Sequence, residues 1–159
     1  MFGLSLETWE ALSYVVTVVG LPAAIGIFIV EQHKERENED EAVYQQLSDN
    51  YQDFLKVALE NPDLGIFSAA ATLQLSPEQN ERLLIIFTML VSLFERAYIL
   101  LYDERMQPRQ ARRWNSWEDY IREWCRRSDF RSRLPELLRG EDPDFVHYVE
   151  KLAAEEDRR

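Results

Sequence analysis

An uncharged segment of twenty residues, from Ala11 to Val30, constrains this chain more than any other feature. At about 1.5 Å of rise per residue, a helix of that length matches the roughly 30 Å hydrocarbon core of a bilayer. A buried helix of a soluble protein is the alternative, but such helices rarely stay apolar on every side for about five turns. A cleaved signal peptide is disfavoured because no Lys or Arg precedes the segment. We therefore expect a transmembrane helix over residues 11–30.

The charges that flank this segment predict its orientation. The first ten residues hold no Lys or Arg, whereas Lys34 and Arg36 follow the segment directly. Because positive flanks stay on the cytoplasmic side, we expect a short extracytoplasmic N-terminus over residues 1–10 and a cytoplasmic domain over residues 31–159. Trp9 is placed to anchor the outer interface.

Helix-breaking and small residues interrupt the apolar segment. Pro22 lacks a backbone N–H and its ring clashes with the carbonyl of Val18, so a kink is expected there. Small residues let two membrane helices approach closely, although Gly and Pro are also more common in membrane helices generally. The candidate contact, with a second copy or with another membrane protein, consists of Gly20, Pro22, Ala23, Ala24 and Gly26.

Charge and cysteine content limit the function classes. The chain carries 18 basic and 29 acidic residues, a net charge of -11, which excludes a general nucleic-acid binder because phosphate contacts need basic surface. The single cysteine, Cys125, excludes an internal disulfide and fits a reducing compartment. We expect this thiol to be buried and inert, although Arg122, Arg126 and Arg127 lie near it in sequence.

The rest of the chain predicts helices only, because no stretch alternates apolar and polar residues between hairpin turns. Apolar residues at three- and four-residue steps predict an amphipathic helix over 42–59, continuous with the membrane helix and ended by Asn61-Pro62. We therefore expect an all-α fold, in which one N-terminal transmembrane helix continues into a cytoplasmic bundle of about four to five helices.

Local signals predict where the later helices begin and end. Ser76, Pro77 and Gln79 form a capping-box pattern that opens a helix running to about Arg105. Its uncharged stretch, residues 83–94, is short for a second membrane span, so we expect the central helix of a soluble bundle. The remaining boundary signals are a break at Pro108, an N-cap at Ser116, a stop at Gly140, and a last helix from Asp142 to about Glu156.

The sequence contains no recognised metal-binding or catalytic motif. His33 and His147 are far apart, no His/Cys pair has a zinc spacing, and no Glu-x-x-His motif occurs. Nucleophile motifs and clustered glycines for a phosphate loop are also missing from the sequence. We therefore expect no metal, no cofactor and no enzymatic activity.

Two groups of residues form a candidate docking or ligand surface. Glu95 and Arg96 follow the most apolar stretch, where a buried charge needs a partner; structural pairing and a polar pocket are both open. The second group is aromatic: Trp117, Tyr120 and Trp124 share one helical face. This face is either core, a docking surface or a contact with the inner leaflet. The full candidate surface is Glu95, Arg96, Arg112, Arg113, Trp114, Trp117, Tyr120 and Trp124.

Several stretches together resemble a recurring class of bacterial membrane-anchored proteins for which no activity is known. In that class a span containing Gly-Leu-Pro leads into a charged helix and then into a helix that ends in Glu-Asn-Pro-Asp-Leu, as at residues 20–22 and 60–64 here. "LFERAYILLYDERM" and "WNSWEDYI" are similar too. The resemblance implies this architecture in the bacterial inner membrane, and it implies no site residues.

These observations favour a membrane-anchored, non-enzymatic scaffold or accessory subunit. Its expected partners are membrane lipid and either another membrane protein or a second copy of the chain. A small-ligand sensor, or an effector that assembles into a pore, is the alternative.

Overall fold

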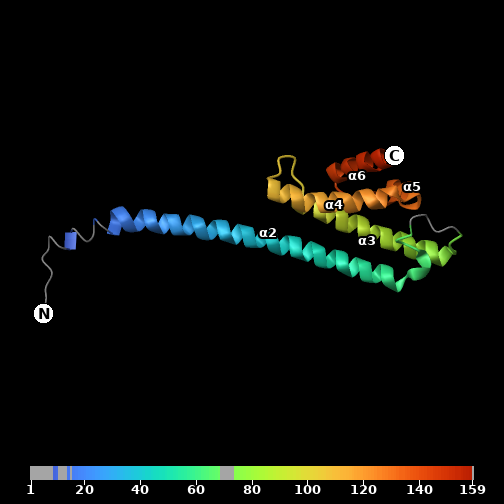
Figure 1. Ribbon diagram of the computed structural model, residues 1–159, viewed down its shortest axis with the longest axis horizontal. Helices are drawn as coiled ribbons and strands as arrows, with labels where there is room; N and C mark the ends of the chain where they lie inside the picture. Colours follow the sequence, from blue (N-terminus) through green and yellow to red (C-terminus); the bar gives the residue numbers. More distant parts are fainter. Residues whose placement is uncertain (1–8, 11–13, 15, 69–73, 159) are drawn as a thin grey trace. The chain divides into compact units, whose positions relative to one another are not determined.

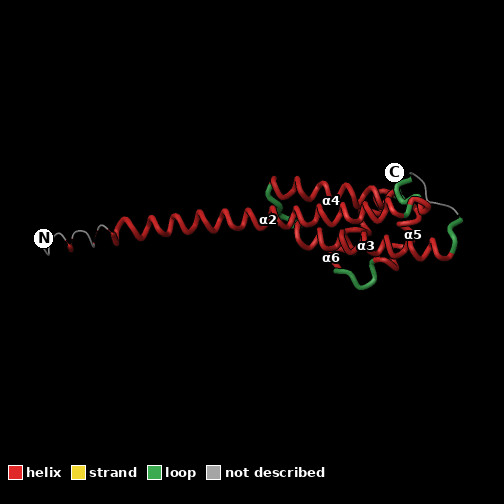
Figure 2. Tube along the Cα trace, turned by 90° about the horizontal axis from the view of Figure 1, so that it is seen from below, coloured by secondary structure: helices red, strands yellow, loops and turns green. Residues whose placement is uncertain are grey.

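The computed structural model describes residues 9–10, 14, 16–68 and 74–158, and these are all helices and connections (Figures 1 and 2). The expected all-α class is confirmed for this part of the chain, which holds five α-helices and no strand. The expected segment 1–10 and residues 11–13 and 15 of the expected span lie largely outside it. The α-helices are α2 (Leu21–Glu60), α3 (Pro77–Leu101), α4 (Pro108–Arg126), α5 (Ser128–Leu137) and α6 (Pro143–Glu156); a π-helix, η1 (Val16–Gly20), and a 3-10 helix, η2 (Pro62–Leu64), are the short ones.

The chain divides into two units, residues 1–43 and residues 44–159. The first unit holds η1 and the N-terminal part of α2, and the C-terminal part of α2 belongs to the second. One helix therefore runs without interruption over residues 21–60, which confirms that the helix expected at 42–59 is continuous with the helix before it. It ends at Glu60, where Pro62 follows, as predicted. We call the second unit the helical domain.

Helix α3 begins as predicted and ends earlier than predicted. The Gln79 N–H donates to Ser76 Oγ at 3.1 Å, and the Ser76 N–H donates back to Gln79 Oε1 at 2.9 Å, which completes the capping box. The end at Arg105 was wrong: Tyr102 is extended, with φ -79° and ψ 135°. The side chain of Gln110 donates to the carbonyl of Leu101 at 3.1 Å and caps the helix there.

The predicted N-cap at Ser116 was wrong. Helix α4 begins at Pro108, and Ser116 lies in its interior. Proline is favoured in the first turn because that position needs no N–H, so Pro108 opens this helix as well as breaking the chain before it. Helix α5 ends at Leu137, and Gly140, with φ +96°, lies in the turn that follows. Asp142 caps α6 as predicted, accepting from two backbone N–H groups.

The core of the helical domain is aromatic and is centred on α4. Trp124 makes ring contacts with Phe54 on α2, Phe87 on α3 and Phe130 on α5. Trp114 contacts Tyr148 on α6, with ring centroids 5.6 Å apart. One face of α4 therefore joins the other four helices, which places the domain's polar groups around it.

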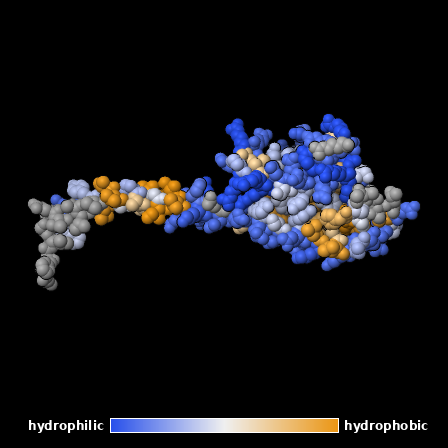
Figure 3. All heavy atoms as spheres, viewed as in Figure 1, coloured by the Kyte–Doolittle hydropathy of each residue, from blue (hydrophilic) through white to orange (hydrophobic). Residues whose placement is uncertain are grey.

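Two helices are long and apolar enough to cross a membrane, judged by length and composition. One covers Val16–Glu60 and the other is α3. In the first helix no part of the apolar 18-residue stretch is buried, whereas 39% of the corresponding stretch in α3 is buried within the protein. Figure 3 shows apolar side chains gathered on the N-terminal part of α2.

Candidate functional site

The apolar part of the first unit is exposed throughout its described length. Every described side chain from Val16 to Val30 is exposed, including those of Pro22, Ala23 and Ala24. Pro22 is the second residue of α2, and the π-helix η1 ends two residues before it. A change of helix type is one way a chain accommodates a proline that cannot donate its hydrogen bond.

Among the described residues, the two glycines of this segment each have room for a Cβ atom. A Cβ at Gly20 would lie 3.7 Å from Val16 Cγ1, an ordinary contact, and one at Gly26 would meet nothing within 4 Å. Glycine in a helix costs about 1 kcal/mol relative to alanine. A second helix could use the space that these glycines leave, because small residues permit close approach of two membrane helices.

The three tryptophans of the candidate surface are core residues. Trp114, Trp117 and Trp124 are 1%, 2% and 3% exposed. Tyr120 is half-buried and stacks on Tyr51 with ring centroids 4.5 Å apart. Of the readings that the sequence left open for this face, the core reading therefore holds for the tryptophans.

The arginines of the candidate surface have different surroundings. Arg112 is exposed, and the guanidinium carbon of Arg113 lies 5.2 Å from the centre of the Tyr44 ring, a cation–π contact. Arg96 is exposed. It lines an open groove of about 390 Å³ between α2 and α3, which Asp53 also lines. The structure therefore does not bring the predicted residues together as one site.

Glu95 is held structurally, but not by an arginine. Its carboxylate accepts from the backbone N–H of Asp142, with 2.5 Å between N and Oε1. Burial and the neighbouring Glu95 raise the pKa of Glu141 to about 7. The sequence indicated a partner for Glu95 but not its identity, because Asp142 lies 47 positions away.

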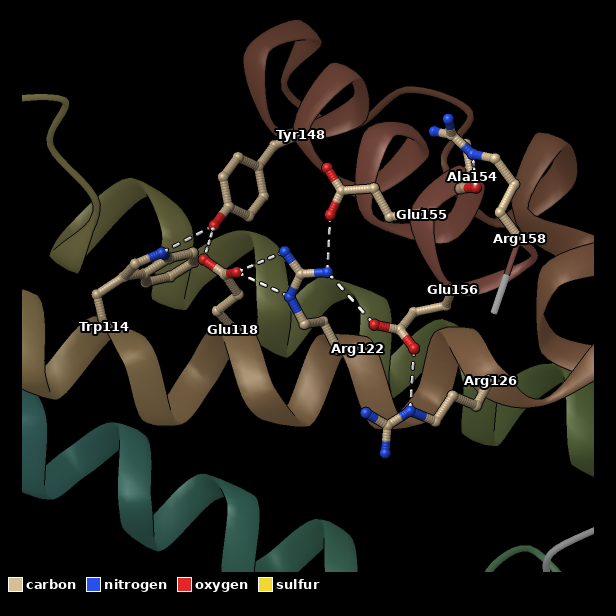
Figure 4. Close-up of polar contacts among 9 residues, drawn as sticks. All are labelled: Trp114, Glu118, Arg122, Arg126, Tyr148, Ala154, Glu155, Glu156 and Arg158. Atoms are coloured by element: carbon tan, nitrogen blue, oxygen red, sulfur yellow. Dashed lines mark hydrogen bonds and ion pairs between the residues drawn. The ribbon is translucent and has the colours of Figure 1, made fainter.

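A polar network that sequence reasoning missed joins α4 to α6 (Figure 4). Trp114 Nε1 donates to the Tyr148 hydroxyl at 3.0 Å, and that hydroxyl donates to Glu118 Oε2 at 2.5 Å. Burial, followed by the hydrogen bond with Glu118, raises the pKa of Tyr148 above its ordinary value. The phenol therefore stays protonated at neutral pH and acts as a donor.

The same network continues along α4 through two arginines. Arg122 pairs with Glu118 at 2.8 Å, with Glu155 at 2.8 Å and with Glu156 at 3.3 Å. The Glu156 side chain is 1% exposed and also accepts from Arg126 at 3.0 Å. The i,i+4 spacing of Glu118, Arg122 and Arg126 was a local signal that could have indicated this row of charges. These ion pairs join α4 to α6 and give the buried Glu156 carboxylate two arginine partners.

A buried arginine joins a loop to the rest of the domain. Arg127, between α4 and α5, is 7% exposed. Its Nη1 donates to the carbonyls of Gly65, Ile66 and Ser68 at 3.2, 2.5 and 3.0 Å. Its Nη2 pairs with Asp129 at 2.7 Å. Asp129 is a near neighbour in sequence, but no local pattern indicates the three carbonyls, which lie about 60 positions away.

Cys125 is expected to resist alkylation while the domain is folded. It is 0% exposed, and burial raises its pKa to about 12, so almost no reactive thiolate forms at neutral pH. Timed labelling of the full chain with iodoacetamide should give no adduct in buffer and complete labelling in denaturant. Rapid labelling in buffer would contradict the buried, inert state.

No group of three or more His, Cys, Asp or Glu placed to hold a metal ion occurs among the described residues. No protein-family model, curated protein or solved structure matches this chain. The exposed apolar segment at 16–30, with its small residues, is the candidate site for contact with a partner or with lipid.

Proposed function

We propose that this chain is a single-pass membrane protein whose helical domain serves as a non-enzymatic scaffold or accessory subunit. The segment at 11–30 crosses the bacterial inner membrane, the N-terminus faces outward and the domain lies in the cytoplasm. Lys34 and Arg36 support this orientation through the positive-inside rule. The observation that carries the proposal is the complete exposure of the described apolar residues from Val16 to Val30.

An exposed apolar segment of this length is expected to be covered by lipid or by another protein. Soluble proteins rarely expose contiguous apolar surface of more than a few hundred Å², and larger patches mark contacts with lipid or protein. A bilayer covers a helix on all sides at once, which suits a segment without any buried described side chain.

A single span is proposed because α3 has another role. Nine of its side chains are buried, including Phe87, Leu90 and Phe94. It packs on α4, α5 and α6, and Glu95 lies within its helical length. A helix that supplies the core of the domain and carries a half-buried carboxyl group suits a soluble bundle better than lipid.

The glycines point to association within the membrane. Within the described residues a Cβ would fit at both positions, and a second transmembrane helix is a partner that could use the space that the glycines leave. We expect the chain to be found in a complex, joined through the segment that contains Gly20, Ala24 and Gly26.

The first experiment is native mass spectrometry of the complex, extracted from its membrane in a nanodisc-forming polymer. A second protein at fixed stoichiometry would support the accessory role and identify the partner. A homo-oligomer alone would favour the self-assembling effector. A monomer without any partner protein would count against both.

Replacing Gly26 by leucine should weaken this association at least tenfold and leave the helical domain unchanged. A Cβ at this position meets nothing within 4 Å, so the larger side chain is expected to act on a contact with a second helix. The fraction of complex in titrated nanodiscs measures the effect, with Ile27→Leu as the control at a neighbouring exposed position. Equal association of both variants would contradict a role for this glycine.

A further inference from the structure

The open groove between α2 and α3 lies on the surface of the helical domain and has a volume of about 390 Å³. Asp63, just after the end of α2, pairs with Arg82, near the start of α3, at 2.6 Å. The two helices therefore run in opposite directions along the groove. Its lining comes from both helices and includes Asp53 on α2 and Met89 and Arg96 on α3.

Helix α3 carries an exposed apolar stripe along this groove. Ile85, Met89, Ser92, Arg96 and Ile99 follow one another at steps of three and four residues, so they share one face of the helix. Ile85, Met89 and Ile99 are 54%, 44% and 59% exposed. The stripe is about 21 Å long at 1.5 Å of rise per residue, which is long enough to contact helices of a partner.

Two opposite charges line the groove and do not pair with each other. Among the described residues Arg96 makes no hydrogen bond or ion pair. Asp53 pairs with Lys56 at 2.7 Å, but both side chains are 69% exposed, and an ion pair so open to water contributes little. The groove therefore presents a cation from α3 and an anion from α2, each accessible to an opposite charge on a partner.

We propose that this groove and the apolar stripe of α3 form the contact between two copies of the helical domain. A two-fold axis that runs between the copies, parallel to α2 and α3, places α3 of each copy opposite α2 of the other without a shift along the axis. Arg96 and Asp53 line the same groove, so Arg96 of each copy then faces Asp53 of the other copy. Two ion pairs form at once beside the apolar contact.

A second copy fits this face better than lipid does. An arginine in the middle of an apolar stripe is costly in hydrocarbon, whereas a second copy supplies the opposite charge at the matching position. The inference rests on the proposed function in one respect. Copies anchored in one membrane have the same direction and a raised effective concentration, so a contact smaller than the usual area of about 800 Å² per partner is sufficient.

Energy transfer between full chains in liposomes tests the contact, with donor or acceptor dyes at the C-terminus and the dimer fraction followed on dilution in lipid. Arg96→Glu should weaken the dimer about tenfold or more, because two pairs of carboxylates then face each other. Asp53→Arg should weaken it similarly, because two pairs of arginines face each other. Both positions are exposed, so the fold should be retained.

Mixing the two variants is the decisive measurement. With the donor on Arg96→Glu and the acceptor on Asp53→Arg, energy transfer should return to the wild-type level. The mixed dimer has a reversed ion pair at one contact and the original pair at the other, and a pair within one chain could not be restored in this way. Arg112→Glu, which changes an exposed arginine on α4 outside the groove, is the control and should match the wild type.

Two results would overturn the contact. The first is wild-type energy transfer in both single variants, and the second is weakened single variants that mixing does not restore. Flotation of the liposomes separates this inference from the proposed function. Chains that do not float would contradict the membrane anchor, and the same mixtures in solution would still test the groove. Floating chains whose energy transfer does not depend on these charges would contradict the groove contact alone.

Discussion

Replacing Trp124 by alanine is expected to destabilise the helical domain by about 4 kcal/mol, because removing a buried aromatic ring leaves a cavity. Trp124 is 3% exposed and contacts rings from four elements outside its own helix, those of Phe54, Phe67, Phe87 and Phe130. A domain of this size has roughly 5–15 kcal/mol of stability, so such a loss consumes much of it.

The loss can be measured on the full chain by the accessibility of Cys125. This thiol is buried in the folded domain, so its labelling across a urea series reports unfolding of the domain and not of the membrane segment. The control is Trp9→Ala, at a position that is 60% exposed, which should leave the urea midpoint unchanged. A Trp124→Ala variant within 1 kcal/mol of the wild type would show that the face is not core.

Helix boundaries were predictable where a few neighbouring residues determine them. Ser76 and Gln79 cap α3, and Asp142 caps α6, through hydrogen bonds to groups no more than three positions away, and both caps are present. The end of α2 before Pro62 has the same local origin. Such contacts survive any tertiary arrangement, so the sequence alone indicates them.

Boundaries that depend on packing were not predictable in the same way. Ser116 resembles an N-cap, but the buried face of α4 runs past it, with Trp114 on one side and Trp117 and Trp124 on the other. Burial of those rings outweighs the modest benefit of a cap. The end of α3 depends on Gln110, which lies in the next helix.

In the candidate site, too, the features that depend on neighbouring residues were predictable and those that depend on packing were not. The apolar segment and its glycines were visible in the sequence, because length and hydrophobicity are local properties. The backbone partners of Glu95 and of Arg127 were not, since they lie 47 and about 60 positions away. The aromatic residues of α4 could be assigned to one face, but only the fold decides that this face is covered.

Replacing Arg127 by methionine is expected to cost the helical domain about 3–4 kcal/mol, since breaking a buried charge pair leaves its partners uncompensated. Three carbonyls, of Gly65, Ile66 and Ser68, lose a charged donor, and Asp129 loses its ion pair. Methionine fills similar volume, so the effect reports the lost donors and not a cavity.

Replacing Arg127 by lysine distinguishes the effect of the positive charge from the effect of the guanidinium geometry. The guanidinium of Arg127 donates to three carbonyls on one side and to both oxygens of Asp129 on the other. An ammonium keeps the charge but has no planar fork, so Arg127→Lys should recover about half of the loss in a urea series. Arg112→Met, at an exposed position of α4, should stay within about 0.5 kcal/mol of the wild type. If Arg127→Met also stayed within that range, the loop at 65–68 would be held by its apolar contacts alone. A large loss in Arg127→Met with the membrane complex still intact would instead separate the two units functionally, since association would then depend on the membrane segment and not on the fold of the domain.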